Sequence, residues 1–115
     1  AESRTGAQTP FESLSRVRLV AQGLPEPRLQ TPFYDDAGLI GLVDMEWDEW
    51  RVIGECDGAV KYTDRADLLR EKVREDRLRA LGHVLVRWTW PELMSSPRAI
   101  AALIWRARAL AQRFR

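Results

Sequence analysis

The sequence predicts an α+β fold: a helix, a three-stranded antiparallel meander, a second helix, a fourth strand and a last helix. Three observations predict this order. Apolar residues recur at helical spacing over three segments, they alternate with a period of two over four others, and glycine, proline or aspartate separates the segments. With 115 residues, 45% of them hydrophobic, the chain is long enough to form one compact domain.

The first helix is predicted to begin after Thr9. This residue is a suitable N-cap, and Glu12 completes a capping box with it. Gly23 follows the last apolar residue of the helical pattern and ends the helix. Residues 1–8 are small and polar, so we expect a linker or a disordered segment there. Residues 9–115 then form the single domain.

Three strands are expected to follow. Residues 28–34 alternate apolar and polar side chains, and Pro32 makes this segment an edge strand. The second strand ends near Asp44, which leaves residues 45–50 as the hairpin connection. Residues 51–57 form the third strand and complete the meander.

The second half of the chain returns to helical spacing over residues 63–81. Asp76 falls within the apolar stripe of this helix, with Lys72 one turn before it. The ordinary explanation is an exposed ion pair, but an acid on the face that packs on the sheet indicates a site. Residues 83–90 are predicted to form a fourth strand and residues 97–114 a last helix. In the helix predicted over residues 63–81, the apolar stripe expected to face the sheet comprises Ala66, Leu69, Val73 and Ala80.

Acidic residues interrupt two of the predicted strands. Asp44 follows apolar residues on one face of the second strand, and Glu55 and Asp57 share one face of the third. Burying an isolated carboxylate is costly or shifts its pKa, so converging acids favour a cation between them. Clustered oxygen ligands suit Mg²⁺ or Mn²⁺. The alternative is that each acid only marks a turn.

Charge is unevenly distributed although the net charge is only +1. Residues 1–60 contain 5 arginines and 11 acids, whereas residues 61–115 contain 13 basic residues and 6 acids. The basic half suits a polyanion, unless its arginines are simply solvated. Of the 18 basic residues only Lys61 and Lys72 are lysines, and both flank the acidic cluster, which suggests a requirement for an ammonium group there.

The expected cellular setting is the cytoplasm. No apolar run is long enough to span a membrane, and no secretory signal opens the chain. Cys56 is the only cysteine and cannot form an internal disulfide, as is typical of a reducing compartment. The chain begins at Ala1 instead of Met, so we expect it to be part of a longer protein.

Several short motifs follow one another along nearly residues 9–93. They are FESLSRVRLV at 11–20, GLP at 23–25, Asp44, ECDG at 55–58, EKVREDRLRALG at 71–82 and VLVRWTW at 84–90. Their order and spacing resemble the PD-(D/E)xK nuclease superfamily. More narrowly, they are similar to the very-short-patch-repair-like endonuclease domains of actinobacterial proteins.

The resemblance implies a restriction-endonuclease-like core that cuts DNA with Mg²⁺ or Mn²⁺. Asp44 and Glu55 would hold the metal, with Asp57 as a further ligand, and Glu12 would orient a water molecule. Asp57 stands where the family pattern has a lysine, so Lys61 or Lys72 would supply the ammonium group.

Other residues take supporting roles in this interpretation. Asp76 would hold the ammonium group in place. Arg74, Arg77 and Arg87 are expected to contact DNA phosphates without reading sequence.

Two alternatives remain open at this stage. A catalytically impaired nuclease-like domain would bind nucleic acid or a partner in a regulatory or toxin–antitoxin-like protein, for which the resemblance implies a winged-helix domain upstream. The other alternative is a structural α+β module whose acids are turn residues.

Overall fold

The computed structural model describes residues 9–57 and 64–113 and confirms the α+β class. Four strands form one sheet in the order β1-β2-β3-β4. The first three are antiparallel, and β4 runs parallel to β3 because α2 crosses over between them. The elements are α1 (Pro10–Ala21), β1 (Arg28–Asp35), β2 (Gly38–Trp47), the 3-10 turn η1 (Asp48–Trp50), β3 (Val52–Cys56), α2 (Arg65–Ala80), β4 (Val84–Trp88), α3 (Trp90–Ser95) and α4 (Pro97–Gln112).

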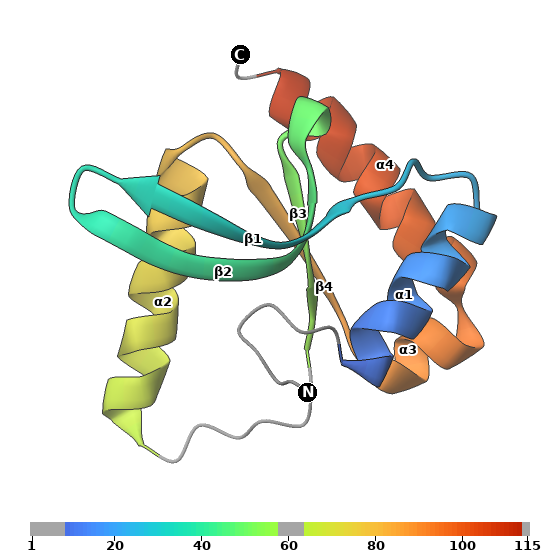
Figure 1. Ribbon diagram of the computed structural model, residues 1–115, viewed down its shortest axis with the longest axis horizontal. Helices are drawn as coiled ribbons and strands as arrows, with labels where there is room; N and C mark the ends of the chain where they lie inside the picture. The colour runs from blue at the N-terminus through green and yellow to red at the C-terminus, as the bar shows by residue number, and fades with distance from the viewer. Residues whose placement is uncertain (1–8, 58–63, 114–115) are drawn as a thin grey trace.

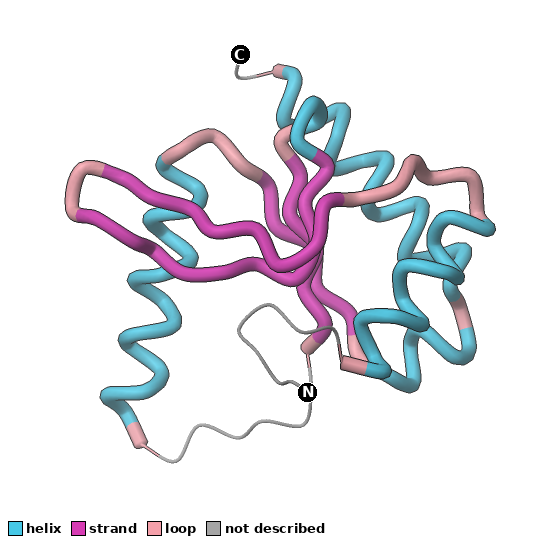
Figure 2. Tube along the Cα trace, in the orientation of Figure 1, coloured by secondary structure: helices cyan, strands magenta, loops and turns pink. Residues whose placement is uncertain are grey.

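The helices cover both faces of the sheet. Figure 1 shows α2 on one side, beneath the β1–β2 hairpin, and α1, α3 and α4 together on the other. Figure 2 shows the same layers, with the strands passing between the two sets of helices. Each face therefore has its own core.

The core beneath α1, α3 and α4 is the larger one. Met45, Trp47 and Trp88 are buried there together with residues of all three helices. Gly54 lies directly under the two indoles: a Cβ at this position would come within 2.6 Å of Trp88. No side chain larger than hydrogen fits between the rings and the backbone, and Ile104 on α4 closes this core.

The predicted start of α1 is confirmed. The Thr9 hydroxyl accepts a hydrogen bond from the backbone N–H of Glu12 at 3.1 Å, and the Glu12 carboxylate accepts one from the N–H of Thr9 at 3.4 Å. This capping box satisfies two backbone donors that the first turn would otherwise leave unpaired.

β2 is longer than predicted. Met45 and Trp47 belong to the strand and pair with Gly54 and Val52 of β3, so residues 45–47 are not part of the connection. The turn is shortened to η1 and Arg51, whose φ of +59° is left-handed. Burial of alternate apolar side chains after Asp44 outweighs the polar residues that suggested an end to the strand.

The prediction of which face of α2 meets the sheet was wrong. Leu69 and Val73 are 56% and 54% exposed, and Leu78 is the one fully buried residue among those described in α2. Charged side chains of α2 cover the sheet instead of the predicted apolar stripe. The reason is that β3 and β4 present a carboxylate and a guanidinium to α2 on this side, at Glu55 and Arg87.

No helix in the described part of the chain is long and apolar enough to cross a membrane.

Candidate functional site

Two carboxyl groups from different elements meet where β2 separates from β3. Glu12 projects from the first turn of α1 and is 7% exposed. Asp44 directly precedes Met45, which is the first residue of β2 in chain order to pair with β3. The Asp44 Oδ2 accepts a hydrogen bond from the backbone N–H of Cys56 at 2.8 Å. The Asp44 side chain therefore takes the place of a backbone acceptor at this fork in the sheet.

The pKa of Glu12 is raised to about 7, mainly by burial, with smaller contributions from a hydrogen bond with Asp44 and from the negative charge of Asp44. Opposing this, the amide of Gln30 donates to Glu12 Oε1 at 2.7 Å, and the backbone of Thr9 also donates. Glu12 therefore holds its proton more tightly than an ordinary glutamate, as a carboxyl does when it is buried beside a second acid.

Carboxylate oxygens are the ligands that hard divalent cations prefer, so Glu12 and Asp44 could hold such an ion. The set is small. Among the described residues, no three His, Cys, Asp or Glu side chains come together closely enough to hold a metal.

Glu55 lies on the other face of the sheet, toward α2, and is held by two arginines. Arg74 Nη2 lies 2.6 Å from Glu55 Oε2, and Arg87 Nη2 lies 3.2 Å from Glu55 Oε1. The hydrogen bond to Glu55 raises the pKa of Arg74, and the charge of Asp44 adds to this shift. Asp44 is therefore within electrostatic reach of both Glu12 and the Glu55 ion pairs.

The ion pairs form a network between α2 and the sheet. Arg87 Nη2 is 2.5 Å from Glu71, and its other nitrogen pairs with Glu75. Arg74 also reaches Glu71 at 3.2 Å and donates to a backbone carbonyl of β2. Three carboxylates and two guanidinium groups thus alternate under the helix. Arg74 and Arg87, which the sequence proposed as phosphate contacts, are engaged within the protein in this structure.

Arg77 is similarly engaged. Its guanidinium donates to both oxygens of Asp35 at 2.8 and 2.5 Å and to the carbonyl of Gly38, which fastens the tip of the hairpin to α2. Hydrogen bonding to Arg77 lowers the pKa of Asp35 to about 2.

The remaining predicted site residues that the structure describes do not join the Glu12–Asp44 pair. Asp57 is exposed just after β3. Lys72 and Asp76 form an exposed i,i+4 ion pair at 3.5 Å, which corrects the expectation that Asp76 packs toward the sheet. Lys61 lies outside the described residues.

The structure adds neighbours that sequence reasoning missed. The thiol of Cys56 lies 3.5 Å from the Ser15 hydroxyl, and the indole N–H of Trp88 donates to that hydroxyl at 2.9 Å. Burial raises the pKa of Cys56 to about 12, so this thiol is not a nucleophile at neutral pH. Gln30, the partner of Glu12, carries no sequence signal beyond its position in the first strand.

The chain is similar to two proteins of Mycobacterium tuberculosis strains, Uncharacterized protein MT2308 and Uncharacterized protein Rv2248. Each is 31% identical over 98 residues, which is 85% of this chain and 36% of the relative. The chain therefore spans about a third of the length of these relatives. No protein-family model matches the chain. No solved structure matches it.

Proposed function

We propose that this domain has a restriction-endonuclease-like core and hydrolyses DNA phosphodiester bonds with the help of Mg²⁺ or Mn²⁺. The observation that carries the proposal is the Glu12–Asp44 pair at the fork between β2 and β3, in which the buried Glu12 lies beside the half-buried Asp44 and has a raised pKa. Such a pair is costly to bury, and a cation-binding role explains why it is there.

The arrangement of elements supports the same proposal. A helix, three antiparallel strands, a crossover helix and a parallel fourth strand bring Glu12, Asp44 and Glu55 from separate elements to the same end of the sheet. The motifs that resemble very-short-patch-repair-like endonucleases lie on these elements.

Each side chain has a distinct role in the proposed reaction. Glu12 and Asp44 would hold the cation, which supplies Lewis-acid polarisation of the scissile phosphate. Without a bound cation the pKa of Glu12 is about 7, so Glu12 would release its proton when the cation binds. Lys61 is the preferred ammonium donor, because Lys72 is exposed and paired with Asp76.

DNA phosphates would compete with Glu55 for its arginines. Arg74 and Arg87 would then exchange an internal carboxylate for a phosphate, which leaves Glu55 free to approach the cation. Such an exchange conserves the number of ion pairs, and bidentate arginines suit either anion.

A second candidate function is DNA or partner binding without cleavage. It is favoured by the ion pairs that neutralise Glu55 and by Asp57 at the position of the family's signature lysine.

A cleavage assay separates the two. Supercoiled plasmid is incubated with the purified protein and Mg²⁺ or Mn²⁺, and nicked and linear products are quantified. We expect cleavage that EDTA abolishes, loss to background in Asp44→Asn, and a reduction of about 100-fold in Glu12→Gln. Asp36→Asn and Glu26→Gln, at exposed positions, are the matched controls and should cut normally.

Cleavage that persists unchanged in Asp44→Asn would contradict the proposed site. Salt-sensitive DNA binding without cleavage, retained in Asp44→Asn, would favour the binding function instead.

A further inference from the structure

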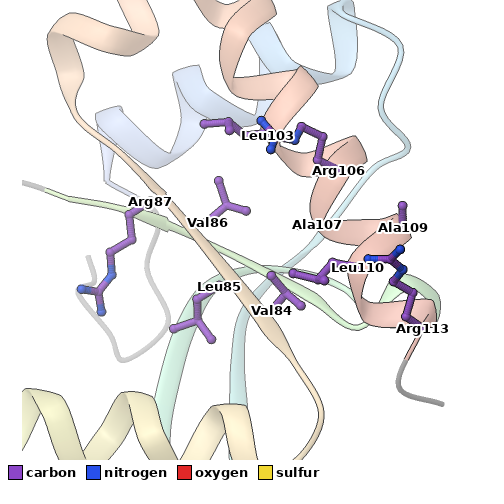
Figure 3. A pocket seen from close by; sticks show the side chains of 10 residues that line it. All are labelled: Val84, Leu85, Val86, Arg87, Leu103, Arg106, Ala107, Ala109, Leu110 and Arg113. Carbon is purple, nitrogen blue, oxygen red and sulfur yellow. The ribbon is translucent and has the colours of Figure 1, made fainter.

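A groove of about 610 Å³ runs along the outer edge of β4, on the side away from β3. Figure 3 shows Val84 and Val86 of β4 on its floor, with Leu103 and Leu110 of α4 beside them. Leu103 and Leu110 are 45% and 42% exposed, so the groove presents apolar surface to solvent.

The groove follows the strand edge instead of lying over one face of the sheet. Four consecutive β4 residues line it, and their side chains alternate between the two faces: Leu85 and Arg87 point to the opposite side of the strand from Val84 and Val86 (Figure 3). Within the described chain β4 pairs only with β3, so its outer N–H and C=O groups have no strand partner. An edge of this kind is a template for another strand.

The rim of the groove is positively charged. Arg106 and Arg113 line it from α4, and neither forms an ion pair with any residue that the structure describes. The described part of α4 contains no acidic residue at all. Arg108, by contrast, stacks over Trp50 and Trp105 and is not part of the groove.

We propose that this groove binds an extended, acidic segment of a partner protein, which adds to β4 as a fifth strand. Apolar side chains of that segment pack on Leu103 and Leu110, and its acids pair with Arg106 and Arg113. This mode of recognition combines backbone hydrogen bonds with side-chain pockets. It does not depend on nuclease activity.

The spacing of the arginines defines the expected segment. Arg106 and Arg113 are seven residues apart, which is about 10 Å along a helix. Two acids four residues apart on a strand lie about 13 Å apart and point to the same face. A second copy of this chain is disfavoured as the occupant, because symmetric pairing would bring the arginines of both copies together.

The probe is a labelled heptapeptide, acetyl-Thr-Glu-Val-Val-Val-Glu-Thr-amide, titrated against the purified protein by fluorescence anisotropy. We expect saturable binding that weakens about 10-fold in the Arg106→Glu, Arg113→Glu double variant. A peptide with lysine in place of both glutamates should bind the double variant more tightly than it binds the wild type. Both substitutions are at exposed positions, and circular dichroism checks that the variant remains folded.

Backbone pairing is tested with two isomers of the peptide, each N-methylated at alternate residues. Only one set of amides points toward β4, so one isomer should lose binding and the other should keep it. The proposal is overturned if neither isomer loses binding or if the charge reversal has no effect. It is also overturned if the protein alone sediments as a dimer that the peptide dissociates, or if a DNA duplex displaces the peptide from the wild type but not from the double variant.

Discussion

Glu12 serves both the local structure of α1 and the candidate site. One of its oxygens accepts the backbone N–H of Thr9 and the amide of Gln30, and its carboxyl faces Asp44. The capping role requires only an acceptor, which a glutamine would also provide. Capping does not explain why the buried carboxyl of Glu12 lies beside a second acid, Asp44.

The raised pKa of Glu12 predicts a specific pH dependence of stability. Its pKa is about 7 in the folded protein against 4.5 ordinarily, so between these values the folded state binds more protons than the unfolded state. The free energy of unfolding should therefore fall as pH rises from 4.5 to 7, by no more than about 3 kcal/mol from this group. In Glu12→Gln the part of this decrease that Glu12 contributes should be absent, as measured by urea denaturation across that range.

The matched control is Glu26→Gln, at an exposed carboxylate, which should retain the wild-type pH profile. If the Glu12→Gln profile were as steep as that of the wild type, Glu12 would not be the group that titrates. Added Mg²⁺ should reduce the slope in the wild type and in Glu26→Gln but not in Glu12→Gln, because a cation between Glu12 and Asp44 favours both ionised forms.

At the scale of elements, α2 is attached to the sheet mainly by charge. Its inner face carries Glu71, Arg74 and Glu75, which pair with Glu55 and Arg87. A surface helix usually buries an apolar stripe, so this attachment depends on each charge keeping its partner.

We predict that Arg74→Ala destabilises the protein by about 2–4 kcal/mol, because it leaves the Glu55 carboxylate buried without its closest cation. Lys72→Ala, which breaks only the exposed pair with Asp76, should cost no more than about 0.5 kcal/mol. Chemical denaturation of the two variants provides the comparison. Equal effects would mean that the network contributes no more than a surface ion pair.

At the scale of the whole molecule, the two faces of the sheet are unequally packed. Among the described residues, the core on the side of α1, α3 and α4 contains twelve buried apolar residues. The core beneath α2 contains four, of which Leu78 is the contribution of the helix itself. Few buried apolar contacts are typical of a segment that opens below the global unfolding free energy.

Native-state hydrogen exchange should therefore show α2 amides exchanging with a lower opening free energy than those of β3 and α4. High salt should lower the opening free energy of the α2 amides further, because the ion pairs beneath the helix are partly exposed and are screened. Uniform protection across α2, β3 and α4 would instead indicate that the molecule opens only as a unit.

Local rules sufficed for the elements whose ends are marked by capping or turn residues. Thr9 and Glu12 predicted the start of α1, and the edge position of β1 followed from Pro32, because these signals act within a few residues. The end of β2 was misjudged at Asp44, since only the core beyond it shows why Met45 and Trp47 continue the strand.

The candidate site was anticipated in part. Asp44 and Glu12 were named from the sequence, and the structure brings them together. Glu55 was expected beside them, but strand alternation places it toward α2 with Arg74 and Arg87, and the charged inner face of α2 could not be foreseen from the spacing of its apolar residues.

By itself, the sequence determined the order of helices and strands except for α3, which begins at Trp90 within the predicted fourth strand, together with the capped start of α1 and the alternation along β3. Those features depend on residues that are close along the chain. Only the tertiary structure decided which charges are paired, which face of α2 is buried, that β4 lies at an open edge, and that two acids 32 positions apart lie together. Each of these features depends on the position of a residue distant in sequence, and local sequence patterns do not predict that position.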